Sequence, residues 1–414
     1  MNKITPYKHQ IEISKQGSKI LNEKGFVYLC MEERTGKTLT SLLIASECNF
    51  KKLLIVTKKK ILGEWTKWMV EYFKTELDKG NSVKFTLINY ESIHTLKSND
   101  EFDLIILDEC HHALSGYPKP SQTYKLLKKY TQKAKIICLS ATPSSQSYSQ
   151  LYHQLSLSVY QPFFKYPNFY AWFKDYGTAV IKMLGARTIK IYDNVTNTEA
   201  IEKIKKDYFI NYTRKELKFK EEPKDIVHYI DMPVEYKDLW TTARKKKYIY
   251  LKEKEANVDK DTIIMLENIS KEMNILHQLE GGAIREGSKF YYLNNLPKIN
   301  YIKEKWGDSK DIAIFYHFMS EGNLLCQHFK NALILQSTAF AEGIDLSHLK
   351  TCIIYSMNYS ASKYTQRRAR MCNIKRTEPI EVNYLLGKGF LSEYIYKLIA
   401  EKHKSFTLSY YQKI

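Results

Sequence analysis

The sequence lacks long apolar runs and any sign of an export signal. No stretch of its 414 residues approaches the roughly 18 consecutive apolar residues that a membrane span needs. The first ten residues, Met1 to Gln10, are polar and contain no signal-peptide core. These absences argue against a membrane protein and predict a cytoplasmic one.

Cysteine is sparse and unpaired in its spacing. The seven cysteines form no C-x-x-C pair, and several lie inside apolar runs; they are residues 30, 48, 110, 138, 326, 352 and 372. Neither a disulfide framework nor a zinc site is indicated, and buried free thiols are the favoured interpretation. The histidines, including His94, His111, His112 and His277, show no metal-ligand spacing either, so we expect hydrogen-bonding or surface roles for them.

Basic residues outnumber acidic ones. Lysine and arginine total 64 against 45 aspartates and glutamates, which gives a formal net charge of +19. Such a surplus attracts polyanions in a salt-sensitive way, and nucleic acid is the leading partner. Three alternatives remain open on charge alone: a lysine-rich compositional bias, a membrane surface and an acidic protein.

Apolar runs of strand length alternate with helix-like segments in two parts of the chain. In the first third they are Gly25 to Met31, Lys52 to Thr57, Val83 to Asn89, Leu104 to Asp108 and Lys135 to Ser140. A second set comprises Ile312 to Phe318, Ala332 to Gln336, Cys352 to Ser356 and Ile380 to Leu385. This alternation predicts an α/β protein with two parallel sheets, and the length exceeds the roughly 250–300 residues of one core.

The middle of the chain, Tyr160 to Lys298, has few strand-like runs. Leu239 to Glu255 and Asp261 to Leu279 are interpreted as helices, and Leu217 to Asp225 as the break between domains. We therefore expect a first domain at 1–217 with a helical extension from about 160, a helical protrusion and linker at 218–298, and a second domain at 299–414.

A phosphate loop follows the first strand-like run. Met31 to Thr38 lies between the strand-like Phe26 to Cys30 and the helix-like Leu39 to Ser46, which is the order that a phosphate loop requires. In it Gly36 allows close backbone approach, Lys37 offers an ammonium to phosphate oxygens, and Thr38 offers a hydroxyl to Mg²⁺. ATP and Mg²⁺ are the expected cofactors. Met31 occupies the position of the usual first glycine.

Two adjacent carboxylates end another apolar strand, Leu104 to Asp108. Open parallel sheets bind ligands at the carboxyl edge of their strands. Asp108 there can hold Mg²⁺ through water, and Glu109 can orient and deprotonate the water that attacks the γ-phosphate. The alternative is a pair of solvated loop acids.

Asp108-Glu109-Cys110-His111 resembles the D-E-x-H box of superfamily 2 helicases and translocases. Other segments resemble the further motifs of that family in order, and the resemblance implies a role for each of their residues. Gln10 and Thr35 would serve the nucleotide, Thr57, Lys58 and Tyr90 the nucleic-acid backbone, and Ser140 and Thr142 the coupling of two domains.

The second half resembles the remaining motifs of the family. Ser337 would contact a phosphate of the track, Asp345 a ribose hydroxyl of the nucleotide, and Arg370 the γ-phosphate as an arginine finger. The family has a further arginine three residues after the finger, where this sequence has Asn373. Either Arg376 or Arg367 substitutes, or the register differs.

The resemblance implies two RecA-like domains in tandem, with helical protrusions between them, that couple ATP hydrolysis to movement along nucleic acid. Glu64 to Trp68, Arg214-Lys215 and Gln278 to Gly282 are similar to the Swi/Snf branch, which favours duplex or branched DNA over RNA. The compact size is more similar to a phage or bacterial member than to a eukaryotic remodeller.

Two other functions stay open at this point. The chain could be the ATPase subunit of a larger DNA-processing or defence complex, or an ATP-binding annealing or clamp factor in which Asn373 marks a lost finger. The aromatic stretch Phe163 to Tyr176 is either core packing or a docking surface. Of the basic runs, Lys58 to Lys60 coincides with a family contact motif, whereas Lys203 to Lys206 and Arg244 to Lys247 fall in the expected protrusions.

Overall fold

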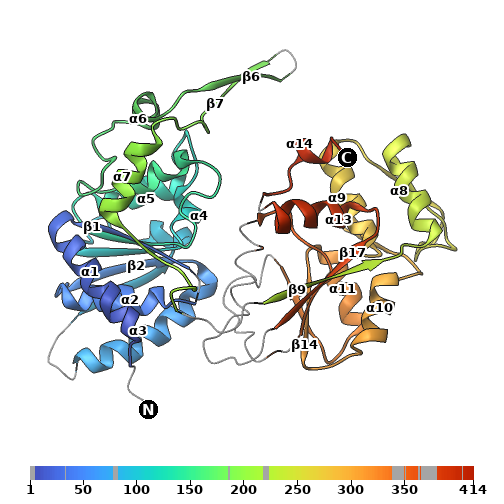
Figure 1. Ribbon diagram of the computed structural model, residues 1–414, viewed down its shortest axis with the longest axis horizontal. Helices are drawn as coiled ribbons and strands as arrows, with labels where there is room; N and C mark the ends of the chain where they lie inside the picture. Colours follow the sequence, from blue (N-terminus) through green and yellow to red (C-terminus); the bar gives the residue numbers. More distant parts are fainter. Residues whose placement is uncertain are drawn as a thin grey trace. The chain divides into compact units, whose positions relative to one another are not determined.

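The computed structural model describes residues 5–32, 34–77, 83–184, 187–217, 223–337, 349, 351–361, 364, 380–402 and 404–414. The chain divides into two compact units, Met1–Lys218 and Phe219–Ile414. Each unit is an α/β structure with its own sheet (Figure 1). We describe each unit by itself.

Unit 1 is built on a six-stranded sheet in the order β3-β2-β4-β5-β1-β8, with all neighbours parallel. Its strands are β1 (Phe26–Met31), β2 (Lys52–Thr57), β3 (Lys84–Asn89), β4 (Leu104–Asp108), β5 (Lys135–Leu139) and β8 (Phe209–Tyr212). All five strands expected in the first third are confirmed, with ends that shift by at most one residue. β8, at the edge beside β1, is the strand that the apolar pattern missed.

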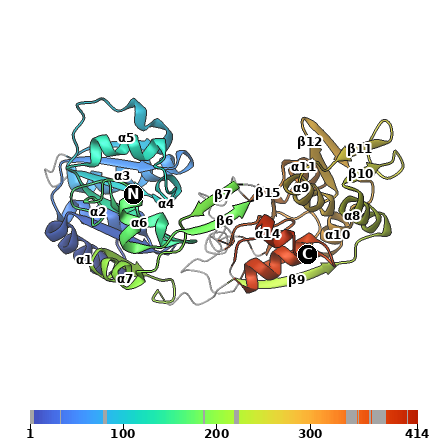
Figure 2. The same ribbon diagram turned by 90° about the horizontal axis from the view of Figure 1, so that it is seen from above.

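Helices cover both faces of this sheet, as Figure 2 shows. They are α1 (Lys8–Lys24), α2 (Lys37–Glu47), α3 (Leu62–Leu77), α4 (His111–Leu114), α5 (Gln122–Thr131), α6 (Phe169–Tyr176) and α7 (Thr198–Tyr208), with short helical turns η1 (Lys59–Ile61), η2 (Tyr90–Thr95), η3 (Tyr148–Leu151) and η4 (His153–Leu155). Successive strand residues point to opposite faces, so the strands contribute side chains to two cores, one on each face of the sheet. One core packs against α1, α2 and α3, and the other against α5 and α6.

The aromatic stretch Phe163 to Tyr176 is core. Trp172 of α6 is fully buried, and its ring lies 5.2 Å from that of Phe163 and 5.5 Å from that of Tyr152, centroid to centroid. The Asn168 side chain accepts a hydrogen bond from Ala171 N–H and caps the start of α6. Beyond α6, the strands β6 (Val180–Leu184) and β7 (Arg187–Ile191) form an antiparallel hairpin.

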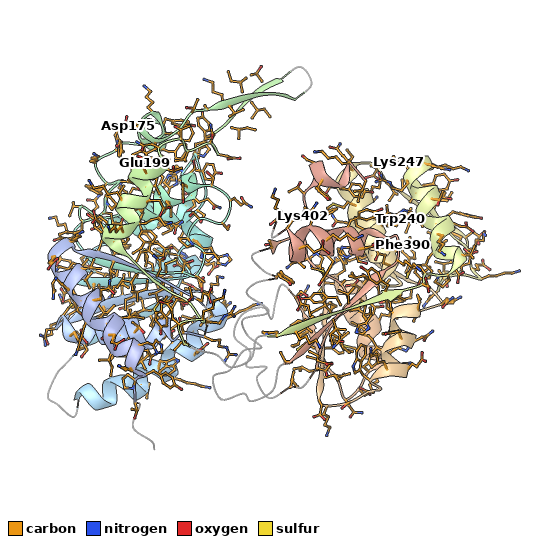
Figure 3. All side chains as sticks on the ribbon, in the orientation of Figure 1. Asp175, Glu199, Trp240, Lys247, Phe390 and Lys402 are labelled. Atoms are coloured by element: carbon orange, nitrogen blue, oxygen red, sulfur yellow. The ribbon has the colours of Figure 1, made fainter. Side chains whose placement is uncertain are left out.

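Unit 2 is built on a five-stranded parallel sheet in the order β15-β14-β16-β17-β9. Its strands are β9 (Lys224–Ile230), β14 (Ile312–Tyr316), β15 (Leu333–Gln336), β16 (Thr351–Ile354) and β17 (Glu381–Gly387). Its helices are α8 (Val234–Lys246), α9 (Ile269–Glu280), α10 (Pro297–Lys305), α11 (Met319–His328), α13 (Leu391–Tyr396), the π-helical turn η5 (Lys397–Glu401) and α14 (Leu408–Tyr411). Trp240 of α8 packs edge-on against Phe390, which precedes α13 (Figure 3). The prediction of two parallel sheets is thus confirmed.

The segment expected as a helical protrusion and linker, 218–298, differs from that expectation. β9 pairs with β17 over seven residues, so the segment supplies an edge of the second sheet. The helix expected at Leu239 to Glu255 ends at Lys246 and gives way to β10 (Tyr248–Leu251), and the one expected at Asp261 to Leu279 begins with β11 (Thr262–Met265). A third hairpin joins β12 (Ala283–Glu286) and β13 (Lys289–Tyr292). Pairing of β10 with β11, residues 248–251 with 262–265, overrides the local helical pattern here.

Six cysteines of the described residues are free thiols. None of the described helices is both long and apolar enough to cross a bilayer.

We predict that Trp172→Ala lowers the free energy of unfolding of unit 1 by ~3–5 kcal/mol, because it leaves a large cavity in a rigid aromatic core. Urea denaturation measures this. The control is Tyr170→Ala on the same helix, since Tyr170 is 45% exposed. Equal stability of the two variants would contradict the packing described here.

Candidate nucleotide-binding site

The phosphate loop turns between β1 and α2. Arg34 and Gly36 adopt left-handed backbone conformations, with φ of 66° and 87°, and α2 begins directly after Gly36. The φ of Gly36 favours glycine, and a Cβ atom there would lie 2.0 Å from Gln10 Nε2, so a larger residue would also displace the Gln10 amide. Met31, at the place of the usual first glycine, is the last residue of β1. It needs no glycine conformation, which explains how methionine fits.

Two side chains of α1 hold this loop from outside. Gln10 Nε2 donates to the Gly36 carbonyl at 3.2 Å, and its Oε1 accepts from Tyr7 N–H at 2.9 Å. His9 Nε2 lies 2.9 Å from the Thr35 carbonyl, and the Thr35 side chain is buried. The predicted nucleotide residues Gln10 and Thr35 therefore meet at the loop. The Gln10 amide keeps a second N–H and a second lone pair for a ligand.

Lys37 and Glu109 come together above the carboxyl edge of the sheet. Lys37 Nζ donates to the Met31 carbonyl at 2.9 Å and lies 3.8 Å from Glu109 Oε1. Glu109 follows β4 with a φ of 47°, a left-handed conformation that is costly for a residue with a Cβ. Such backbone strain concentrates at functional sites, and here it turns the carboxylate toward the loop lysine.

The Asp108 carboxylate accepts hydrogen bonds from two other elements. Thr57 Oγ1 at the end of β2 and Trp65 Nε1 of α3 both donate to its Oδ2, at 2.7 and 2.8 Å. Tyr90 donates its hydroxyl to the Asp108 carbonyl at 2.8 Å. No hydrogen bond among the described residues occupies Oδ1, which leaves that oxygen to a ligand.

Two of the residues expected to contact nucleic acid bond to Asp108. Thr57 is fully buried and Tyr90 is 6% exposed, and both hydroxyls are used on Asp108. Their side chains therefore support this residue, and their contact with nucleic acid stays a prediction. Lys58, next to Thr57, is half-buried. Trp65, which the sequence marked only as part of a Swi/Snf-like helix, contributes directly to the Asp108 site.

His111 connects the carboxylates to the end of β5. Its Nδ1 lies 2.7 Å from Ser140 Oγ and 3.4 Å from Glu109 Oε2, and Ser140 Oγ accepts from Thr142 N–H at 3.0 Å. Burial, reinforced by His112, Lys58 and Lys37, lowers the pKa of His111 to about 2. A neutral imidazole thus bonds to Ser140, one of the two residues that were expected to couple domains, and lies close to Glu109.

The chain leaves unit 1 beside the phosphate loop. β8 runs parallel to β1 with Tyr212 in register with Met31, and Glu32 N–H donates to the Tyr212 carbonyl. The Glu32 carboxylate in turn accepts from Arg214 N–H at 2.9 Å and lies 3.3 Å from Arg214 Nε. No local sequence pattern predicts this pair, because 182 residues separate its members.

In unit 2, Ser337 follows β15 and is 1% exposed. Its N–H donates to the Tyr316 carbonyl at 2.7 Å, while its hydroxyl has no hydrogen-bond partner among the residues that the structure describes. A buried, unsatisfied hydroxyl is uncommon and suits a residue that binds a ligand. Asp345, Arg370 and Asn373, the other second-domain residues singled out in the sequence, lie outside the described residues.

The residues present in unit 1 fit a magnesium-bound nucleoside triphosphate. The loop glycine leaves a cradle beside Gln10, and α2 directs its first N–H groups and its positive end toward the loop. No group of three or more His, Cys, Asp and Glu side chains that could hold a metal occurs in the described parts of the chain. Mg²⁺ needs none, because it keeps several waters and takes one or two protein ligands together with phosphate oxygens.

We predict that Thr57→Val lowers the free energy of unfolding by ~1–3 kcal/mol, since it removes a donor from a buried carboxylate. ATP turnover should fall as well, because Asp108 loses its fixed orientation. Urea denaturation and a phosphate-release assay measure the two effects. Thr66→Val on exposed α3 surface is the matched control, and equal behaviour of the two variants would show that the Asp108 bond is unimportant.

We predict a pH-dependent stability that traces to His111. Between its unfolded pKa near 6.5 and its folded pKa of about 2, the unfolded chain binds a proton that the folded chain does not. The advantage of wild type over His111→Asn should therefore shrink by about 2 kcal/mol as pH falls from about 7.5 to 5. Denaturant titrations across that range test it, and a constant difference would contradict a buried neutral imidazole.

Comparison with known proteins identifies two family segments. Residues 3–145 match the family "Type III restriction enzyme, res subunit", and residues 310–375 match "Helicase conserved C-terminal domain". A SWI/SNF-related matrix-associated actin-dependent regulator of chromatin, subfamily A-like protein 1, from Xenopus tropicalis is 21% identical over 424 aligned residues, which cover 93% of this chain and 43% of the relative. The chain thus spans less than half the length of that relative.

A solved structure described as the Sulfolobus solfataricus SWI2/SNF2 ATPase core in complex with dsDNA is similar at a TM-score of 0.45 and 15% identity, over 97% of this chain and 94% of that one. The two family segments fall on the two parallel sheets, one in each unit. The chain therefore contains, in order, a segment similar to the type III restriction enzyme res subunit family and a segment similar to the helicase C-terminal domain family, one in each of its two α/β units.

Proposed function

We propose that this protein hydrolyses ATP with Mg²⁺ and uses the cycle to move along DNA. The observation that carries the proposal is the meeting of Lys37 and Glu109, 3.8 Å apart, at the carboxyl edge of the first sheet. A lysine and a carboxylate so placed can serve one phosphoryl group from two sides, the lysine on its oxygens and the carboxylate on the attacking water.

The roles of the neighbouring residues follow from their positions. Thr38, in the first turn of α2, and Asp108, through Oδ1, would hold Mg²⁺ and its waters. Bound there, Mg²⁺ would offset charge on the phosphate oxygens. Gln10 and Thr35 would hold the nucleotide from the α1 side of the loop. By the resemblance, Asp345 would contact a ribose hydroxyl of the nucleotide and Arg370 its γ-phosphate, with Asn373 at the place where the family has a further arginine.

DNA is the proposed track for two reasons. The net charge of +19 suits a polyanion, and the Xenopus tropicalis relative, a regulator of chromatin by name, aligns over 93% of this chain. Lys58 and Ser337 are the proposed contacts to the track, one in each unit, and such backbone contacts carry little base specificity. The proposal favours duplex or branched DNA.

We predict that Glu109→Gln abolishes DNA-stimulated ATP hydrolysis while nucleotide binding persists, because the amide cannot accept the proton of the attacking water. Lys37→Ala should lose both hydrolysis and tight binding. Phosphate release in the presence of duplex, single-stranded and forked DNA and of RNA measures turnover, and fluorescent-nucleotide anisotropy measures binding.

The control is Glu91→Gln, which changes an exposed carboxylate on η2 beside Tyr90. It should hydrolyse ATP as wild type does. Turnover retained in Glu109→Gln, or wild-type turnover that no nucleic acid stimulates, would refute the proposed function.

A further inference from the structure

One oxygen of the Asp108 carboxylate is fully used inside unit 1. Thr57 Oγ1 and Trp65 Nε1 donate to the same atom, Oδ2, at 2.7 and 2.8 Å. A carboxylate oxygen offers about two lone-pair sites, so these donors fill both sites of Oδ2. No hydrogen bond from a described residue reaches Oδ1. The carboxylate is thus asymmetric, with one oxygen closed by donors and one open to a ligand.

The surrounding structure holds this asymmetry in place. Asp108 is 6% exposed, and Thr57 and Trp65 are fully buried on two separate elements, β2 and α3. The Tyr90 hydroxyl donates to the Asp108 carbonyl at 2.8 Å and fixes the backbone of the same residue. Any turn of the carboxylate that presents both oxygens to one ligand would break the bonds to the two donors. Leaving buried donors without partners costs free energy of folding, so the structure opposes such a turn.

The direction of the Trp65 indole is specific, because packing alone does not require its hydrogen bond. Trp172, in the other core of unit 1, is equally buried, yet its Nε1 has no hydrogen-bond partner among the described residues. An indole N–H can only donate, so Trp65 cannot change roles and accept a bond from a metal-bound water. Trp172 therefore fills space, whereas Trp65 fills space and closes Oδ2.

A carboxylate with one open oxygen discriminates between divalent cations. Mg²⁺ keeps several waters and needs one or two carboxylates beside phosphate oxygens, whereas Ca²⁺ takes about six to eight oxygens and accepts a carboxylate through both of its oxygens. The neighbouring acids have other contacts: Glu32 accepts from Arg214 N–H at 2.9 Å, and Glu109 lies 3.8 Å from Lys37 Nζ. The site therefore suits Mg²⁺ and offers Ca²⁺ few oxygens.

We propose that Trp65, together with Thr57, determines which metal accompanies the nucleotide. By closing Oδ2, the two donors restrict Asp108 to a contact through Oδ1, and this restriction favours Mg²⁺ over Ca²⁺. Trp65 acts through Asp108 and is a positioning residue. The inference rests on the proposed function for the presence of a metal-bound nucleotide at this site. It adds the residues that set the choice of cation.

The test measures how tightly the full chain binds a fluorescent, non-hydrolysable ATP analogue, by anisotropy, in excess Mg²⁺, in excess Ca²⁺ and in EDTA. Wild type should bind best with Mg²⁺. Trp65→Phe keeps an aromatic ring in the core but lacks the donor, so its affinity with Mg²⁺ should fall about tenfold, as for other losses of a partner that orients a metal ligand. Its affinity with Ca²⁺ should change less than about twofold, because the freed Oδ2 lets both oxygens bind the larger ion.

A second donor variant and two controls accompany Trp65→Phe. Thr57→Val frees the same oxygen from another element, so it should shift the preference toward Ca²⁺ as well, and it serves as the test if circular dichroism shows Trp65→Phe to be unfolded. Trp68→Phe makes the same change at a half-buried position of α3, and Thr57→Ser retains a hydroxyl donor. Both controls should keep the wild-type preference for Mg²⁺.

An equal loss of affinity with the two metals would assign Trp65 a packing role and overturn the inference, as would a wild-type preference in both donor variants. Failure of the proposed function has a different signature. A wild-type chain that binds the analogue with Mg²⁺ but releases no phosphate from ATP would refute the proposed function alone. A wild-type chain that binds no more tightly with Mg²⁺ than in EDTA would overturn both.

Discussion

The parallel pairing of β1, β5 and β4 is the constraint on which the nucleotide site depends. Because the three strands run in the same direction, the phosphate loop after β1, Glu109 after β4 and Ser140 after β5 emerge at one edge of the sheet. Their side chains then need only short contacts, Lys37 to Glu109 and His111 to Ser140, to form one connected site. An antiparallel strand among them would move one of these groups to the opposite edge.

Two buried side chains beside that edge fix the orientation of Asp108. Thr57 and Trp65 reach its carboxylate from β2 and α3, and both are fully buried. Burying a carboxylate costs free energy of folding unless hydrogen-bond donors satisfy it. Loss of either the donors or the acid would therefore leave the other unsatisfied. Thr57, which resembles a track contact, thus also holds the Asp108 carboxylate in place.

The sequence predicted the fold where local pattern and burial agree. The central strands are continuous apolar runs because both of their faces are covered, as in Lys52–Thr57 and Leu104–Asp108. β8 and β9 escaped prediction because they are edge strands of mixed polarity, and their pairing depends on residues far along the chain. The same limit applies to the site: the G-K-T and D-E residues are adjacent in sequence and could be predicted, whereas His9, Trp65 and Arg214 reach it only through tertiary contacts.

Two sets of short polar contacts surround the phosphate loop. Through Glu32 and Arg214 the loop is bonded to the segment that follows β8, and the Ser140 hydroxyl after β5 bonds to His111 after β4 and to Thr142 N–H. Buried polar contacts of this kind have few alternative geometries. They therefore hold the segments that follow β1, β4, β5 and β8 in fixed positions at one edge of the sheet.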